Sequence, residues 1–419
     1  MTAAPPDFTA AVRAAEAELR SIFDPTPLQR NDYLSARHGA EIWLKREDLS
    51  PVRSYKIRGA ANAMRKALAA DPTRRRFVCA SAGNHAQGMA FACRHYGTEG
   101  VVFMPVTTPQ QKIDKTRQFG GGQVEIRLVG DYFDATLASA QAYCAEAGAT
   151  FLPPFDSADV IEGQATCALE ILDQLPEGTT PDLLVLPVGG GGLAAGMVRA
   201  FSALSPATGF RFVEPAGGPS LRAALEAGEV VTLPKVDNFV DGAAVARIGD
   251  LTFAELRRFA PEDVLIAPED RICGTMVDLL NVEGIVLEPA GALAIDALRD
   301  LDLTGRTVVA VVSGGNFDFE RLPDVKERAL RWEGRKKYYI LRLPQRPGAL
   351  REFLNTLGPH DDISRFEYLK KSARNFGSVL LGIESHGRAD FDGLEARMSA
   401  AGFSFQDITE DTVITSLII

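Results

Sequence analysis

The segment DLLVLPV (182–188) runs directly into four glycines and then into LAAGM (193–197). A short, almost wholly apolar run predicts a strand that is buried on both faces, and the residues after the glycines have helical character. Apolar runs of the same kind recur along the chain, and helical stretches separate most of them: RFVCAS (76–81), GVVFMP (100–105), VEIRLV (124–129), GFRFVE (209–214) and TVVAVVS (307–313). This alternation predicts an α/β fold with parallel sheets and helices on both faces.

The N-terminal part of this pattern begins with a helical periodicity over residues 8–22, which Pro25 and Pro27 would stop. A strand is expected at EIWLKRE (41–47), and helices are expected at 54–70 and 133–147. The α/β pattern extends to about residue 330. We therefore expect residues 1–330 to form one region of two α/β subdomains.

The pattern changes at RWEGRKK (331–337), a basic and polar stretch that we interpret as a linker. Residues 338–419 are expected to form a separate small domain. Strands are predicted at 338–343, 362–371, 378–385 and 403–408, and helices at 348–358 and 390–402. The order βαββαβ is that of a ferredoxin-like fold.

Composition excludes several classes of protein. The chain has 419 residues, 46% hydrophobic and 24% charged, and a net charge of −10. An acidic protein is a poor partner for nucleic acid, whose phosphates need a basic surface. No apolar run reaches the ~18 residues of a membrane-spanning helix, and the N-terminus lacks the apolar core of a signal peptide. The five scattered cysteines are expected to be reduced thiols in a cytoplasm: Cys79, Cys93, Cys144, Cys167 and Cys273.

The motif VGGGGLAAGM (188–197) is the strongest chemical signal. Glycines let backbone N–H groups come close to a phosphate, and the helix that follows adds unpaired donors and a partial positive charge. The motif is neither a Walker loop, since GK[ST] is absent, nor G-x-G-x-x-G with its acidic partner. A turn without a ligand is the alternative, but four glycines there are costly in backbone entropy. We favour a phosphate-binding loop.

Two other strand ends carry small polar residues. In CASAGNHAQGMAFA (79–92), Ser81, Gly83 and Asn84 form a turn that suits a carboxylate, although an ordinary helix cap at Ser81 or Asn84 is the alternative. We interpret the neighbouring His85 as a structural residue. In VVSGGNFD (311–318), Ser313 is expected at the carboxyl end of its strand, where open α/β sheets collect ligands. These loops and SYKIRGA (54–60) are predicted to face one cleft.

Together these motifs resemble the pyridoxal-phosphate enzymes of fold type II, the tryptophan-synthase-like group, and within it the threonine dehydratase family. The resemblance covers about residues 20–325. Its motifs are PTPLQR (25–30), KREDLSPVRSYKIRGA (45–60), SAGNHAQG (81–88), GGGGL (189–193), LEPAGA (287–292) and SGGN (313–316). The C-terminal part resembles the regulatory ACT-like domain of the biosynthetic enzymes of the isoleucine pathway, present here as a single module.

The resemblance implies a role for individual residues. Lys56 would bind pyridoxal 5'-phosphate as a Schiff base and then act as general base; its amine must be neutral to attack an aldehyde, which partial burial favours. Asn84 would bond the phenolic oxygen and Ser313 the pyridine nitrogen. A serine is a weaker electron sink than a carboxylate there, which favours β-elimination. The phosphate would be held by Gly189, Gly190, Gly191, Gly192 and Leu193, and the substrate by Ser81, Gly83 and Asn84.

The implied reaction converts L-threonine into 2-oxobutanoate and ammonia, and serine would give pyruvate. The resemblance also implies inhibition by isoleucine, its relief by valine, and a homo-oligomer, namely a tetramer. Pro347 and Gly348 lie at an expected strand-to-helix turn, where backbone N–H groups would take an effector carboxylate.

At two positions the sequence departs from related racemases, and these differences limit the activity and the metal binding that the resemblance implies. Serine racemases carry a serine as the second base where this chain has Ala82, so we expect no racemisation. Racemase-like relatives also bind a divalent metal near a Glu-Pro segment. Here Glu214-Pro215 has no second carboxylate nearby in the sequence, so we predict no metal. Three alternatives remain: a serine or hydroxyaspartate dehydratase, a non-catalytic amino-acid sensor that keeps the cofactor, and a C-terminal module that only assembles subunits.

Overall fold

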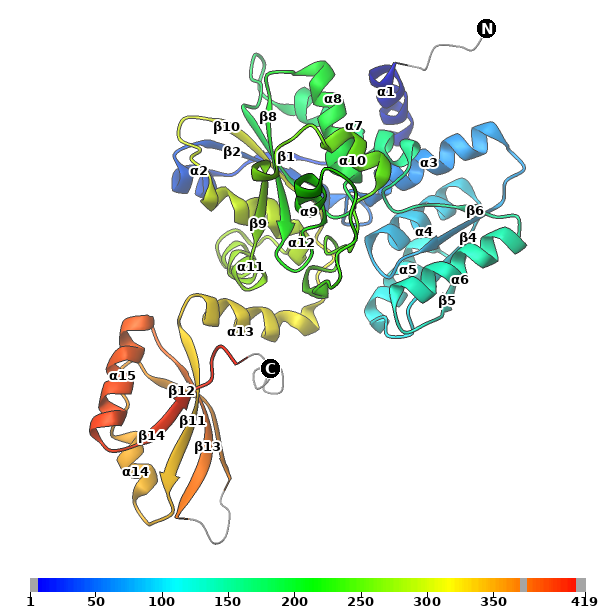
Figure 1. The fold of residues 1–419 in the computed structure, drawn as a ribbon. Helices are drawn as coiled ribbons and strands as arrows, with labels where there is room; N and C mark the ends of the chain where they lie inside the picture. Colours follow the sequence, from blue (N-terminus) through cyan, green and yellow to red (C-terminus); the bar gives the residue numbers. More distant parts are fainter. Residues whose placement is uncertain (1–6, 370–374, 412–419) are drawn as a thin grey trace. The chain divides into compact units, whose positions relative to one another are not determined.

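The computed structural model describes residues 7–369 and 375–411 (Figure 1). The chain forms two compact units. Unit 1 comprises Met1–Glu269 and Gly284–Asp318, and unit 2 comprises Asp270–Glu283 and Phe319–Ile419. Unit 2 thus includes two stretches that lie before the predicted linker. The domain bounds 1–330 and 338–419 stay a prediction.

Unit 1 contains a six-stranded sheet that is parallel except at one edge, where β1 (Leu28–Arg30) pairs antiparallel with β2 (Glu41–Arg46). The order continues through β10 (Thr307–Val312), β7 (Leu183–Pro187), β8 (Gly209–Pro215) and β9 (Val264–Ala267). Every residue of β7 is buried because helices cover the sheet. On one face α7 (Ala158–Gln174) and α8 (Gly192–Leu204) share a core with alternate residues of β7 and β10, and α12 (Pro289–Asp296) contacts β7, β8 and β10.

A second sheet of unit 1 has four parallel strands in the order β5 (Val124–Leu128), β4 (Glu99–Met104), β3 (Arg76–Ala80) and β6 (Thr150–Phe151). Alternate residues of β3 point to opposite faces, as a strand requires. Phe77 and Cys79 pack with α3 (Lys56–Ala70) and α4 (Asn84–Tyr96), whereas Val78 and Ala80 pack near α6 (Phe133–Glu146). The predicted α/β fold with two mainly parallel sheets is confirmed (Figure 1).

Other helices of unit 1 are α1 (Phe8–Leu19), α2 (Asp32–His38), α5 (Gln110–Gly120), α9 (Ser220–Ala227) and α10 (Asp250–Leu256). The helix predicted over 8–22 therefore ends three positions early, and α3 begins at Lys56 rather than Ser54 because Ser54 pairs with Gly314. The five cysteines are free thiols, four of them buried. In the part of the chain that the structure describes, no helix is both long and apolar enough to span a bilayer.

Unit 2 contains a four-stranded antiparallel sheet in the order β12 (Asp362–Leu369), β13 (Phe376–Glu384), β11 (Lys336–Pro344) and β14 (Ser404–Asp407). With α14 (Ala349–Leu354) and α15 (Arg388–Ala400) it gives the predicted ferredoxin-like order, around a core that includes Tyr339 and Phe391. The end of the strand predicted at 362–371 lies outside the described residues. Two further helices, α11 (Glu269–Glu283) and α13 (Leu322–Trp332), complete the unit.

The stretch interpreted as a linker at 331–337 is mostly regular structure. Helix α13 continues to Trp332, and β11 already begins at Lys336, so only 333–335 connects them. The polar composition has a physical reason. The Lys336 ammonium lies 2.6 Å from Glu327 Oε2 of α13 and 3.0 Å from Glu384 Oε1 of β13. Ion pairs between elements, rather than exposure in a linker, explain the charge of Lys336.

Candidate active site

The predicted site residues follow the carboxyl ends of three strands of unit 1. Gly189 follows β7, Ser313 follows β10, and Ser81 follows β3. The first two strands belong to the six-stranded sheet and the third to the four-stranded sheet. The site is therefore assembled from both sheets, and the contacts between its loops show how they are held together.

Lys56 is the first residue of α3 and is partly buried. Its ammonium donates a hydrogen bond to the Pro154 carbonyl over 3.0 Å. The segment before it is tied to SGGN: the Tyr55 N–H donates to the Ser313 carbonyl over 3.1 Å, and the Gly315 N–H donates to the Arg53 carbonyl over 2.9 Å. These backbone bonds explain why the predicted SYK and SGGN segments lie together.

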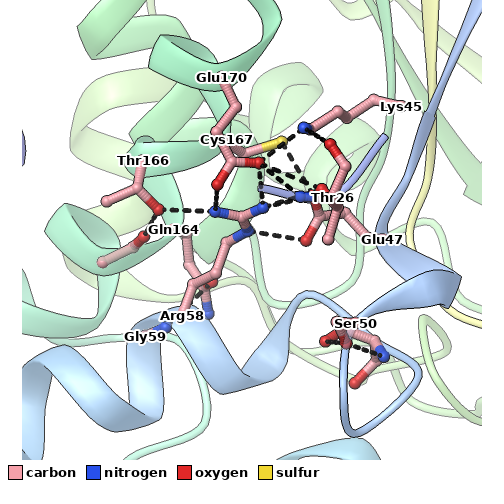
Figure 2. Close-up of polar contacts among 12 residues, drawn as sticks. Thr26, Lys45, Glu47, Ser50, Arg58, Gly59, Gln164, Thr166, Cys167 and Glu170 are labelled. Carbon is pink, nitrogen blue, oxygen red and sulfur yellow. Dashed lines mark hydrogen bonds and ion pairs between the residues drawn. The ribbon is translucent and has the colours of Figure 1, made fainter. Parts of the chain in front are cut away.

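A fully buried charge cluster surrounds Arg58, which follows Lys56 by two positions in the first turn of α3 (Figure 2). Arg58 donates to Glu47 Oε2 over 2.7 Å and to Glu170 Oε2 over 2.6 Å, and Lys45 lies 2.6 Å from Glu170 Oε2. Burial alone would raise the pKa of Glu170, but Arg58 and Lys45 hold it well below its usual range. The cluster fixes α3 to β2 and α7 and so fixes the start of the helix that carries Lys56.

The glycine loop is closely packed and has no room for side chains. A Cβ atom on Gly190 would lie 2.2 Å from the Phe155 ring, and one on Gly189 would lie 2.9 Å from the Ala243 carbonyl oxygen. Gly191 has φ 88°, in the left-handed region that glycine tolerates, and it caps the N-terminus of α8. The loop thus presents bare backbone at a helix start, as a phosphate-binding loop requires.

Asn84 is held from two sides. Its Nδ2 donates to Glu288 Oε1 over 2.7 Å, and its Oδ1 accepts from Asn316 Nδ2 over 2.8 Å. The alternative that Ser81 or Asn84 caps α4 is wrong, because Gly83 is the N-cap and has no side chain to donate or accept. Burial, and then the charge of Asp241, raise the pKa of Glu288 to about 7, although the Asn84 amide opposes the shift.

The remaining predicted residues have these surroundings. The Ser313 hydroxyl is buried and donates to the Ala290 carbonyl over 3.2 Å. Ser81 Oγ accepts from the Gly83 N–H over 3.2 Å, which shapes the asparagine turn. His85 Nε2 lies 2.9 Å from the Leu152 carbonyl, and burial with the charge of Lys56 lowers the pKa of His85 to about 3. A neutral, carbonyl-bound ring fits the structural role expected for His85.

Several contacts were not predicted from the sequence. Glu288 and Asn316 stand in the quoted motifs LEPAGA and SGGN, but their link to Asn84 joins residues more than 200 positions apart. Phe155, which packs against the glycine loop, has no signal of its own in the spacing of motifs. A buried acid in an otherwise apolar LEPAGA run was the one available sign for Glu288.

The site fits a phosphorylated pyridine cofactor. Ser54 Oγ and Asn316 Oδ1 are among the buried polar atoms of the described residues that lack a hydrogen-bond partner; Ser54 precedes Lys56 by two positions, and Asn316 is bonded to Asn84. The glycine loop offers backbone to an anion, and Lys56 offers an amine to an aldehyde.

Residues 7–369 and 375–411 contain no group of three or more His, Cys, Asp and Glu side chains that would hold a metal ion. Glu214 instead accepts the Leu221 and Arg222 N–H groups.

Comparison with known families gives the class of this protein. Residues 19–314 match the family described as pyridoxal-phosphate dependent enzymes. The chain therefore belongs to this family, and its cofactor is pyridoxal phosphate. Residues 327–418 match a second family, the C-terminal regulatory domain of threonine dehydratase. The two families together cover both parts of the threonine dehydratase architecture, with one regulatory module.

Individual relatives agree with this placement. The chain is 47% identical to the biosynthetic L-threonine dehydratase IlvA of Bacillus subtilis over 409 residues, which cover 97% of this chain and 96% of the relative. It is 44% identical to the enzyme of the same name from Staphylococcus aureus, over 96% of each chain. The solved structure of processed threonine deaminase isoform 2 from Solanum lycopersicum superposes with a TM-score of 0.71 at 35% identity, covering 78% of this chain and 95% of that one.

Proposed function

We propose that this protein dehydrates and deaminates L-threonine to 2-oxobutanoate and ammonia as a biosynthetic threonine dehydratase. The observation that carries the proposal is the assembly around Lys56. Its amine, the glycine loop after β7, Asn84 and Ser313 belong to one compact unit and are tied together by hydrogen bonds and close packing. A lyase of this class supplies the first step of isoleucine synthesis.

Each residue has a defined task in this proposal. The backbone N–H groups of Gly189–Gly192 and the start of α8 hold the cofactor phosphate. Asn84, fixed by Glu288 and Asn316, keeps its second amide hydrogen for the phenolic oxygen. The Ser313 hydroxyl, which donates to the Ala290 carbonyl here, would donate its proton to the pyridine nitrogen of the cofactor. When bound, pyridoxal phosphate withdraws electrons from the α-carbon of the substrate.

Lys56 moves the proton. Its amine takes the proton from the α-carbon, and the electron pair left behind forms a double bond to the β-carbon. The Cβ–O bond breaks and the hydroxyl leaves; together with the proton taken from the α-carbon it makes up the water that is lost. The released enamine tautomerises to an imine, which water hydrolyses to 2-oxobutanoate and ammonia. The turn formed by Ser81, Gly83 and the start of α4 is proposed to bind the substrate carboxylate.

Serine or hydroxyaspartate is the alternative substrate. The methyl group that separates threonine from serine is worth only ~1–3 kcal/mol, so serine turnover to pyruvate at a lower rate is expected beside threonine turnover.

Regulation is assigned to unit 2, with isoleucine as inhibitor and valine as the antagonist of isoleucine. The chain leaves unit 1 after Asp318, just beyond Asn316, and returns to it at Gly284, just before Glu288. Both crossings are therefore continuous with residues that hold Asn84. This continuity supports a coupling between effector binding and the position of Asn84. We also propose a homotetramer and a cytoplasmic location.

The test is the release of 2-oxo acid by the purified holoenzyme from L-threonine, L-serine and hydroxyaspartate, each with and without isoleucine. A higher kcat/KM for threonine, with release suppressed by isoleucine and restored by valine, is the expected result. A preference for another substrate would assign the chain to a related dehydratase. A holoenzyme that binds threonine without releasing product would identify the non-catalytic sensor instead, and release that ignores isoleucine would refute the regulatory role of unit 2.

A further inference from the structure

The glycine loop is supported from behind by a threonine that belongs to no recognised motif. Thr252, in α10, is completely buried, and its hydroxyl donates to the Gly190 carbonyl over 2.8 Å. The N–H of Gly249 points at the same carbonyl oxygen over 3.4 Å. The Gly190 carbonyl therefore has two donors that lie on the α10 side of the loop.

This arrangement sets the direction of the next N–H group. The peptide bond between Gly190 and Gly191 is planar and trans, so its C=O and N–H point in opposite directions. Because Thr252 holds the Gly190 oxygen, the Gly191 N–H must point away from α10. Gly191 caps α8, so this N–H belongs to the first donors at the helix start, where an anion binds.

Thr252 is itself held in place by the segment that contacts Lys56. The Asp156 carboxylate accepts the N–H groups of Asp250, Leu251 and Thr252 at 3.0, 2.8 and 3.3 Å, and so caps α10. The carbonyl of Pro154, two positions before Asp156, accepts a hydrogen bond from the Lys56 side chain, and the Phe155 ring packs against Gly190. One short segment thus links the amine to the glycine loop and to the helix behind it.

We propose that Thr252 is a positioning residue for cofactor binding, which aims the Gly191 N–H at the phosphate by fixing the Gly190 carbonyl. The proposal rests on the role of Gly189–Gly192 as the phosphate-binding loop. Asp156 acts indirectly in this proposal, because its carboxylate caps α10, the helix that carries Thr252. Neither residue touches the cofactor in this account.

The test measures cofactor affinity in the apoenzyme by absorbance titration with pyridoxal 5'-phosphate and, separately, with pyridoxal, which lacks the phosphate. Thr252→Val keeps the shape and removes the hydroxyl. We expect the Kd for pyridoxal 5'-phosphate to rise about 3- to 10-fold, the range that one uncharged hydrogen bond supplies, while the Kd for pyridoxal stays unchanged. Thr252→Ser should restore the wild-type affinity.

Thr136→Val is the matched control. Thr136 is equally buried, and its hydroxyl donates to the Val129 carbonyl over 2.7 Å, away from the glycine loop. This variant should leave both Kd values unchanged. If Thr252→Val does not fold, Asp156→Asn supplies the same comparison, with loss of affinity for the phosphorylated cofactor only.

Two results would overturn the proposal: an unchanged Kd for pyridoxal 5'-phosphate, or an equal loss of affinity for both compounds, which would indicate a general structural effect. A wild-type apoenzyme that binds pyridoxal as tightly as pyridoxal 5'-phosphate would instead refute the phosphate-binding role of the loop itself. The two failures are therefore distinguishable.

Discussion

The Asn84 side chain and the buried Glu288 carboxylate are joined by a hydrogen bond of 2.7 Å between Nδ2 and Oε1. The two residues come from different parts of unit 1, at the start of α4 and just before α12. The bond leaves Asn84 with one amide hydrogen for another acceptor. Glu288, an acid with a raised pKa, is thus in direct contact with Asn84, the residue proposed to bond the phenolic oxygen of the cofactor.

Glu288 should make stability depend on pH. Burial raises its pKa from 4.5 to about 7, so the folded protein binds more protons than the unfolded chain between these values. Stability from this group is therefore lost as pH rises from about 4.5 to about 7. The neutral variant Glu288→Gln should gain up to about 3 kcal/mol over wild type across this window. Urea midpoints at several pH values measure the difference, and parallel curves for the two proteins would contradict it.

The buried cluster around Arg58 should be costly to break. Removing one partner leaves the other charges buried and unpaired, so Arg58→Met should destabilise unit 1 by about 3–5 kcal/mol. Arg76→Met is the control, because Arg76 pairs with Glu99 on the surface, where an ion pair contributes ~0–1 kcal/mol. The two variants are compared by urea denaturation. Equal effects would show that the cluster in Figure 2 does not fix the start of α3.

The glycine loop should not accept a methyl group at Gly190. Gly190→Ala would place Cβ against the Phe155 ring, so we expect loss of cofactor binding. The double variant Gly190→Ala/Phe155→Ala should recover part of the affinity because it removes the ring. Gly274→Ala in α11, where the nearest atom lies 3.4 Å from the added Cβ, is the neutral comparison. Unchanged cofactor absorbance in Gly190→Ala would contradict the close packing described above.

The isoleucine response should depend on the ion pairs that join α13 to the sheet of unit 2. Lys336→Met removes the contacts with Glu327 and Glu384, and should change the isoleucine concentration for half-inhibition at least about threefold. The activity without isoleucine should stay at the wild-type value. Lys337→Met is matched to it, since Lys337 lies on the same strand but pairs with Glu395 and Asp407 within the small domain. If both variants had the same isoleucine concentration for half-inhibition, α13 would have no part in the coupling between isoleucine binding and activity.

The sequence predicted the main strands well because strands buried on both faces are continuous apolar runs. It did not predict β1, β6 and β9, which have three, two and four residues and offer too little pattern. The sequence did not predict that α13 and β11 leave only 333–335 of the stretch 331–337 outside regular structure, because the ion pairs of Lys336 depend on Glu327 and Glu384, whose proximity only the fold creates.

In the candidate site, too, residues that belong to a local sequence motif could be predicted, whereas residues that act through contacts made by the fold could not. Lys56, Asn84, the four glycines and Ser313 occur in local motifs with recognisable chemistry, so the sequence predicts them. Thr252 and Asp156 support the glycine loop through hydrogen bonds that span 62 and 94–96 positions. No local pattern marks such residues, because their role follows from the carbonyl or N–H group that the fold brings to them.

The most direct test of the account compares 2-oxobutanoate release from L-threonine by wild type and Lys56→Ala, both saturated with pyridoxal 5'-phosphate. We expect product from wild type, essentially none from Lys56→Ala, and partial recovery when a small primary amine such as methylamine is added to the variant. Undiminished release by Lys56→Ala would contradict the assignment of Lys56 as the residue that moves the α-proton.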